Sequence, residues 1–208
     1  MKTRMRLPSG HSKRARQASA VVQSGIYQLK VVLAGSKPPI WRRIQVPGRS
    51  TLAALHHVLQ RTMGWDDDHL HEFVVGDVSY GKPAREDDLF VPKMLDESRV
   101  KLKDVIPTAG KSFRYIYDFG DDWIHVIKVE KVLIPDEGVS YPLCLEGENA
   151  CPPEDSGGIY GYYEKLEIIK DRNHPDYEDI IDWLGRRFDP SFFNLEAINR
   201  SLRKLSKE

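Results

Sequence analysis

The segment FRYIYDFGDDWIHVIKVEKVLI, residues 113–134, constrains the fold most, because apolar and polar residues alternate on both sides of one short break. Alternation with a period of two is typical of β-strands, whose successive side chains point to opposite faces. The break contains Gly120 and Asp121, and a two-residue type II′ turn places glycine where a positive φ is needed. We therefore predict a long β-hairpin with a positive φ at Gly120, and we expect Asp121 and Asp122 to be at least partly exposed.

The same turn predicts how the two strands of the hairpin are paired. With Gly120 and Asp121 at its centre, Asp118 faces Trp123 and lies diagonal to His125 on one face of the sheet, with α-carbons ~7–8 Å apart. Tyr115 and Tyr117 then lie on the other face, which we expect to be the core. Asp118 and His125 are left available either for a binding site or for a hydrogen bond that joins the strands.

The tripeptide Asp118-Phe119-Gly120 also occurs in the magnesium-binding loop of protein kinases. A kinase needs, in addition, a glycine-rich phosphate loop, a strand lysine paired with a helix glutamate, and a His-Arg-Asp catalytic loop. The sequence upstream of residue 118 lacks this set. We therefore interpret the segment as the tip of a hairpin.

Other segments predict an α+β fold around this hairpin. Residues 26–35, 40–46 and 69–81 show strand patterns, and residues 52–63 show helical spacing, with Ser50 or Thr51 as the cap and Gly64 as the stop. The order of hairpin, helix and strand, followed by a tight turn before a long strand, resembles the β-grasp layout. We predict a β-grasp-like mixed sheet with one crossing helix plus a carboxy-terminal helical subdomain.

The predicted organisation has three parts. Residues 1–25 form a basic flexible arm, residues 26–134 form the α+β core, and residues 135–208 form a Pro/Gly-rich loop and a helical subdomain packed on the core. Helical patterns occur at residues 162–169, 176–185 and 194–205. We expect the loop between Cys144 and Tyr163 to pack on the sheet through apolar anchors, which are Leu143, Leu145, Ile159 and Tyr160.

Five stretches match a known family in order and spacing: PPIWRRIQVP, TLAALHHVLQRTMGWDDDHLHEF, FRYIYDFGDDWIH, YPLCLEGENACPPEDSGGIYGY and HPDYEDIIDWLGRRFDPSFFN. Together they resemble the plasmid pRi open-reading-frame-three-like family. The resemblance extends from Ile26 to Leu205 and leaves out the arm. It implies a cytoplasmic α+β domain whose biochemical role is unknown.

Charge is distributed unevenly along the chain. Residues 1–65 hold 12 of the 31 Lys and Arg residues and none of the 31 Asp and Glu residues, so this part carries +12 and the remainder carries −12. Such a split indicates either a basic surface for polyanions or two parts that neutralise each other within one fold. The residues that we expect to contact nucleic acid are Arg4, Arg6, Lys13, Arg14, Arg16, Arg49 and Arg61.

The arm leads to a prediction about DNA binding. If its six basic residues each contact a phosphate, the logarithm of the binding constant should fall with the logarithm of salt concentration with a slope of about −5 on duplex DNA. The measurement compares the full-length chain with a chain that starts at Ser24 across a salt series. Equal binding by both chains, or no binding by either at low salt, would contradict a role for the arm.

Several side chains are of the kinds that hold divalent metal ions. His69 and His71 alternate on a predicted strand and so share a face, and the chain has only two cysteines, Cys144 and Cys151. Six residues separate the cysteines, whereas cysteine pairs in zinc sites usually lie two to four residues apart. The cysteines are therefore either ligands or small buried apolar groups. The candidate metal ligands are His69, His71, Asp118, His125, Cys144 and Cys151.

Composition and segment lengths indicate the compartment and the class of function. No apolar run approaches the ~18 residues of a membrane span, and two cysteines exclude a disulfide framework, so we expect a reducing cytoplasm. We predict a non-catalytic binding or regulatory module that contacts nucleic acid or a protein partner, and the family resemblance implies an association with plasmids or mobile elements. The alternative is a metal-dependent hydrolase that uses the Asp-, His- and Cys-rich loops.

Overall fold

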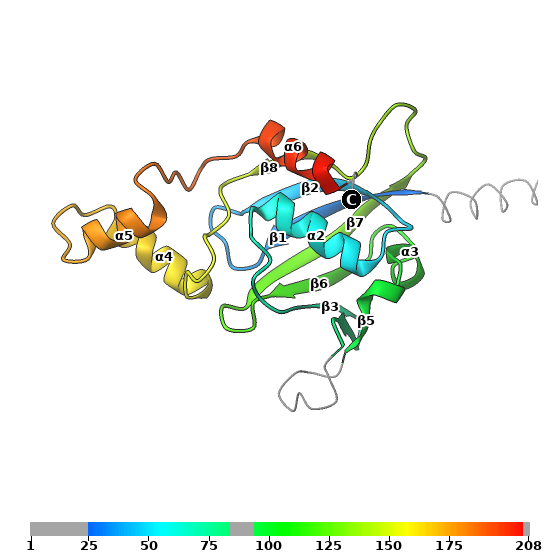
Figure 1. Cartoon of the computed structure of the whole chain (residues 1–208), viewed down its shortest axis with the longest axis horizontal. Helices are drawn as coiled ribbons and strands as arrows, with labels where there is room; N and C mark the ends of the chain where they lie inside the picture. The colour runs from blue at the N-terminus through cyan, green and yellow to red at the C-terminus, as the bar shows by residue number, and fades with distance from the viewer. Residues whose placement is uncertain (1–24, 84–93, 206–208) are drawn as a thin grey trace, which may run out of the picture.

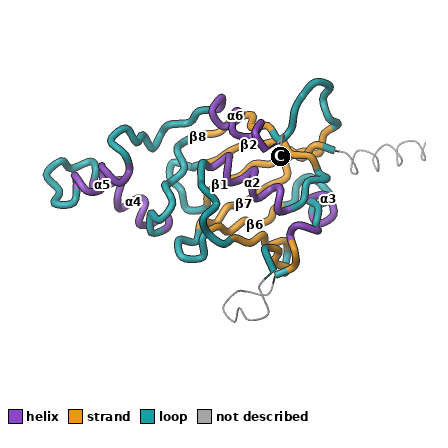
Figure 2. The backbone as a smooth tube through the Cα atoms, viewed as in Figure 1, coloured by secondary structure: helices purple, strands orange, loops and turns teal. Residues whose placement is uncertain are grey.

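The computed structural model describes residues 25–83 and 94–205, and within them one twisted sheet carries helices across one face and at one end (Figures 1 and 2). The strands are β1 (Ile26–Leu33), β2 (Trp41–Pro47), β3 (His71–Val75), β4 (Val78–Gly81), β5 (Leu95–Asp96), β6 (Ser112–Tyr117), β7 (Trp123–Leu133) and β8 (Leu143–Glu148). The helices are α2 (Leu52–Met63), the 3₁₀ turn η1 (Glu97–Arg99), α3 (Leu102–Val105), α4 (Gly158–Ile168), α5 (Tyr177–Leu184) and α6 (Leu195–Leu205). None of these helices is long and apolar enough to cross a membrane.

The sheet has the strand order β5-β4-β3-β6-β7-β1-β2-β8. Neighbouring strands are antiparallel, except for β4 and β5 at one edge, which are parallel. The predicted α+β class is therefore confirmed. The β-grasp likeness is not confirmed, because the sheet is antiparallel throughout its centre.

Helix α2 has the ends that the sequence predicts. The Thr51 hydroxyl, rather than Ser50, accepts a hydrogen bond from the Ala54 N–H at 3.1 Å, and Gly64 ends the helix with a φ of 93°. A left-handed residue at this position suits glycine, which has no β-carbon to clash. The apolar stripe of α2 joins the core of the sheet through Leu52, Leu55, Val58, Leu59 and Met63.

The β6–β7 hairpin is present, but its predicted register is wrong. Tyr117 pairs with Trp123 and Tyr115 pairs with His125, so all four side chains lie on the same face, and each is buried. His125 therefore belongs to the aromatic core and does not share a face with Asp118. The observed register buries the large Trp123 ring on the same face as the tyrosines. The predicted register would have placed this ring on the opposite face.

The loop of this hairpin also differs from the predicted two-residue turn. It spans residues 118–122, and the left-handed backbone falls on Asp118 (φ 58°) and Asp122 (φ 52°) rather than on Gly120. Aspartate tolerates this conformation better than most residues do, and the Asp118 carboxylate accepts a hydrogen bond from the Gly120 N–H at 2.9 Å. The predicted exposure is confirmed, since Asp121 is half-buried and Asp122 is exposed.

The carboxy-terminal part contributes both a strand and helices. The expected loop from Cys144 onward begins inside strand β8, which pairs with β2 and extends the sheet beyond residue 135. Helix α6 packs against α2 and β8, whereas α4 and α5 contact each other at one end of the sheet (Figure 1). Of the expected apolar anchors, Ile159 packs against the core, but Tyr160 is 88% exposed and anchors nothing.

Candidate metal centre

Three loops meet beside the carboxy-terminal end of α2, and they comprise residues 64–70, 118–122 and 149–157. The Trp65 indole donates a hydrogen bond to the Pro152 carbonyl at 2.9 Å, which joins the first loop to the third. The Gly157 N–H donates to the Asp121 carboxylate at 3.0 Å, which joins the third loop to the hairpin tip. The side chains carried by these loops are therefore held in fixed relation to α2.

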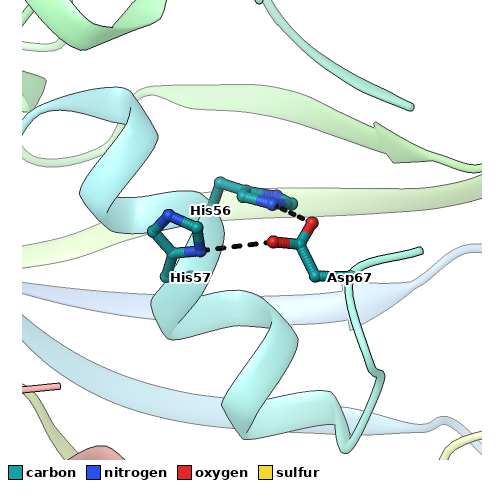
Figure 3. A group of neighbouring side chains, drawn as sticks. All are labelled: His56, His57 and Asp67. Atoms are coloured by element: carbon teal, nitrogen blue, oxygen red, sulfur yellow. Dashed lines mark hydrogen bonds and ion pairs between the residues drawn. The ribbon is translucent and has the colours of Figure 1, made fainter. Parts of the chain in front are cut away.

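Two adjacent histidines of α2 face one carboxylate of the first loop (Figure 3). His56 Nε2 lies 2.6 Å from Asp67 Oδ1, and His57 Nδ1 lies 3.5 Å from Asp67 Oδ2. One atom from each residue lies within 4.8 Å of the others, as a shared metal ion requires. Asp67 has a φ of 69°, a left-handed backbone of the kind that is often found at functional sites.

Neighbours fix the orientation and the protonation of His56. Its Nδ1 lies 2.8 Å from the Tyr115 hydroxyl, which also accepts a hydrogen bond from the Gln60 amide at 2.9 Å. Burial, and to a lesser extent the nearby His71, lower the pKa of His56 to about 3, while Asp67 acts in the opposite direction. His56 is therefore neutral at pH 7, which is the form of imidazole that binds metal ions.

A second imidazole and carboxylate pair lies directly against His56. The rings of His56 and His71 stack with centroids 3.5 Å apart and an angle of 4° between their planes. His71 Nε2 lies 2.9 Å from Glu97 Oε2, and both side chains are almost fully buried. This stack covers one face of the His56 ring and, together with the Tyr115 contact at Nδ1, restrains the position of its Nε2.

A cavity opens beside the His56, His57 and Asp67 cluster. Its volume is about 230 Å³, and it is lined by His57, Gln60, Arg61, Trp65, Asp66, Asp67 and Leu205. The side chain of His57 is 52% exposed, whereas that of His56 is 1% exposed. A metal ion at this cluster would therefore have a buried side and a side open to a ligand.

His69, Asp118 and Asp155 form a second group of potential ligands. His69 Nδ1 lies 3.7 Å from Asp118 Oδ2, and His69 Nε2 lies 3.5 Å from Asp155 Oδ1. The structure thus brings together the predicted residues His69 and Asp118, and it adds Asp155. One atom from each residue again lies within 4.8 Å of the others, but this group is the weaker candidate because it offers one imidazole rather than two and the Asp155 side chain is 77% exposed.

The other predicted metal ligands do not take part in either group. His71 points into the core toward Glu97, and His125 is fully buried with its ring edge-on to Trp65 at 5.2 Å. Cys144 lies in β8 and Cys151 in the loop that follows, and both are free thiols. Within residues 25–83 and 94–205, these four residues belong to neither group of potential ligands.

The predicted nucleic-acid contacts do not form one patch on the described residues. Arg49 and Arg61 are exposed, but they flank opposite ends of α2, whose 12 residues span ~18 Å. The remaining predicted contacts lie outside the described residues, and they are Arg4, Arg6, Lys13, Arg14 and Arg16. A role for them in nucleic-acid binding stays a prediction.

His56, His57 and Asp67 were not among the predicted ligands, although the sequence carries a signal for them. The two histidines stand near the middle of the helix in HHVLQRTMGWDDDH, and three aspartates follow the glycine that ends it. A left-handed Gly64 turns the chain, which lets the aspartates lie along the helix they have just left. Adjacent histidines before such a turn are the signal that the sequence offers, although they do not determine which aspartate lies against them.

Comparison with known proteins identifies the family and the relatives of this chain. It matches the family described as Plasmid pRiA4b ORF-3-like protein over residues 25–197. The chain belongs to this family. The predicted kinship is thereby confirmed, and the match begins where the described residues begin and includes every side chain of the two ligand groups.

The chain is also similar to a curated sequence and to a solved structure. The uncharacterized protein y4hQ of Sinorhizobium fredii is 38% identical over 185 residues, which cover 88% of this chain and 93% of the relative. The crystal structure of a protein of unknown function, MM3350 from Methanosarcina mazei Go1, is 41% identical, with a TM-score of 0.74. The likeness covers 83% of this chain and 97% of that structure. These names describe proteins without a known activity, so the function must be argued from the site.

Proposed function

We propose that this pRiA4b ORF-3-like protein is a binding module that holds a divalent transition-metal ion at His56, His57 and Asp67. The observation that carries the proposal is the convergence of two different imidazole nitrogens on the two oxygens of one carboxylate. Two histidines and one carboxylate form a ligand set that suits zinc and ferrous iron, and it leaves coordination positions open.

Three features of the surroundings support this function. His56 is neutral at pH 7, and the Tyr115 hydroxyl at its second nitrogen can fix the ring as outer partners do in metal sites. A cation at His56 Nε2 would require the one ring proton of neutral His56 to lie on Nδ1, where the Tyr115 oxygen is placed to accept it. The open positions would face the cavity of about 230 Å³.

Metal binding at this place would have a consequence for the three loops. The ion would tie Asp67 to α2, and the loop of Asp67 is already tied to the third loop through Trp65 and Pro152. Occupancy would therefore stabilise the junction of all three loops, which gives the module a regulatory character. The alternative, a metal-dependent hydrolase that uses the Asp-, His- and Cys-rich loops, also needs a bound metal ion, so an absence of metal binding would exclude it.

The proposal predicts the result of a zinc titration. Protein freed of metal with EDTA should bind one Zn²⁺ per chain by isothermal titration calorimetry, and Asp67→Asn should weaken binding by at least about 100-fold. Asparagine tolerates the left-handed backbone of Asp67, so the loop should keep its shape.

Asp155→Asn provides the matched control, because Asp155 is also a left-handed aspartate (φ 58°) of the second group. We expect it to bind zinc like the native chain. Zinc binding that survives Asp67→Asn and disappears with Asp155→Asn would assign the metal ion to the second group, and it would contradict the proposal. An absence of stoichiometric zinc binding by the native chain would also contradict it.

A further inference from the structure

Arg42 is a buried cation whose partners are neutral. Arg42 lies on β2 and is 3% exposed. The next residue, Arg43, forms an ion pair with Glu130 at 2.6 Å. Arg42 Nη1 donates hydrogen bonds to the carbonyls of Trp41 at 2.9 Å and Glu148 at 2.8 Å. Arg42 Nε donates to the carbonyl of Thr62 at 3.3 Å. Three backbone carbonyls thus fix the guanidinium in place.

The charge of Arg42 is not balanced by an anion within the described ranges, 25–83 and 94–205. No carboxylate there lies within 4.0 Å of its guanidinium, and its Nη2 has no hydrogen-bond acceptor among those residues. The nearby thiols do not supply a charge, because burial raises the pKa of Cys144 to about 11 and of Cys151 to about 12. Buried charges are ordinarily paired, since removing an ion from water costs several kcal/mol.

A cavity of about 200 Å³ borders this guanidinium. The Phe193 ring stacks on Arg42 with its centroid 4.9 Å from Cζ, and Arg61 lies at the boundary between this cavity and the one beside the candidate metal centre. The remaining lining is mainly apolar and includes Met63, Ala150, Cys151, Phe192, Ala197 and Ile198.

We propose that Arg42 and Arg61 form an anion-binding subsite for the carboxylate of a small organic acid with an apolar body. The carboxylate would accept hydrogen bonds from Arg42 Nη2 and from Arg61, and the apolar body would lie against Phe192, Phe193 and Ile198. This arrangement of a few polar groups in an apolar pocket is typical of small-molecule sites. The ligand would balance the buried charge of Arg42.

An apolar carboxylate fits this cavity better than a free phosphate ion does. Phosphate carries more charge and needs several donors, whereas the cavity offers the Arg42 guanidinium, one exposed arginine and Asn194 among mainly apolar walls. The inference does not depend on metal at His56, His57 and Asp67. The test is therefore carried out in EDTA, so that failure of one proposal leaves the other standing.

The test is a ¹H–¹⁵N NMR titration of the full chain with benzoate, with its uncharged counterpart benzamide, and with inorganic phosphate. We expect saturable benzoate binding with shifts at Arg61 and Phe193, and at least tenfold weaker binding of benzamide. Arg42→Met should remove the preference for benzoate. Arg61→Gln should weaken benzoate binding about fivefold, as loss of an exposed charge does.

Arg49→Gln is the control, since Arg49 is an exposed arginine at the other end of α2, and it should leave benzoate binding unchanged. Equal affinities for benzoate and benzamide, or no benzoate binding at 10 mM, would overturn the proposal. Phosphate that displaces benzoate at equal concentration would overturn the assignment to a carboxylate. If Arg42→Met does not fold, the preference for benzoate and the effect of Arg61→Gln decide the question.

Discussion

Replacing His125 with phenylalanine is expected to remove about 3 kcal/mol of the acid sensitivity of the folded chain between pH 7 and pH 4. His125 is fully buried, and neither ring nitrogen has a hydrogen-bond partner. Burial lowers its pKa to about 4, although the backbone carbonyls of Tyr115 and Trp123 lie close enough to oppose the shift, and the charge of Arg42 adds to it.

The direction of the pH effect follows from the two states of the chain. Unfolded histidine takes up a proton as the pH falls below about 6.5, whereas folded His125 stays neutral until about pH 4. The unfolded state therefore binds more protons in this window, and the free energy of unfolding falls as the pH falls from 6.5 to 4. Phenylalanine has no proton to bind, so the variant loses this part of the dependence.

The measurement is urea unfolding of the native chain and His125→Phe at several pH values from 7 to 4. At pH 7 we expect the two chains to differ by no more than about 2 kcal/mol, because removal of an unpaired buried imidazole offsets the larger ring. His174→Gln, a change at a partly exposed histidine between α4 and α5, serves as the control and should keep the native pH dependence. Parallel pH profiles for native chain and His125→Phe would contradict a buried neutral His125.

Replacing Glu97 with alanine is expected to lower the free energy of unfolding by about 3 to 5 kcal/mol. Glu97 holds His71 Nε2 through hydrogen bonds of 2.9 and 3.1 Å, and water does not reach the pair. The substitution leaves a buried imidazole without a partner and opens a cavity beside it. Since His71 stacks on His56, the change should also loosen one ligand of the candidate metal centre.

The double variant His71→Phe, Glu97→Met tests whether this loss comes from the pair itself. Both partners are replaced by apolar side chains of similar size, so no buried polar group is left unpaired, and we expect the double variant to be more stable than Glu97→Ala by about 2 kcal/mol or more. Urea unfolding at pH 7 measures both. A double variant as unstable as Glu97→Ala would show that the loss reflects packing at this position, and not the orphaned imidazole.

Local signals in the sequence were sufficient for the elements whose ends are set by nearby residues. Helix α2 has a hydroxyl cap at Thr51, an apolar stripe and a terminal Gly64, and each acts within one turn of the chain. The hairpin was also predictable as a hairpin, because strand alternation is local. Its register was not, because it depends on which side chains the rest of the core buries.

Contacts between distant segments explain what the sequence did not reveal. Strand β8 lies among Pro and Gly residues that indicate a loop, and it becomes a strand because β2 offers a free edge roughly one hundred residues earlier. The pair of His71 and Glu97 joins residues separated by 26 positions, on elements with no shared pattern. Pairing of this kind is decided by the fold as a whole.

The candidate site was predictable only in part, because its residues also come from segments that the fold brings together. His69 and Asp118 do meet, because β3 and β6 are antiparallel neighbours and β3 begins where β6 ends, with His71 opposite Tyr117. Asp67 was overlooked because its contact with His56 depends on the path of the chain after Gly64. That path follows from a left-handed glycine and an aspartate with positive φ. Neither residue type indicates in the sequence which direction the chain takes after the helix.

The most direct test of the metal centre is a crystal of the protein soaked in zinc, with anomalous scattering measured at the zinc absorption edge. We predict a single strong peak ~2.0–2.2 Å from His56 Nε2, His57 Nδ1 and an oxygen of Asp67, with the Tyr115 hydroxyl still at the second nitrogen of His56. A strong peak instead at His69, Asp118 and Asp155 or at the cysteines, with none beside Asp67, would contradict the account.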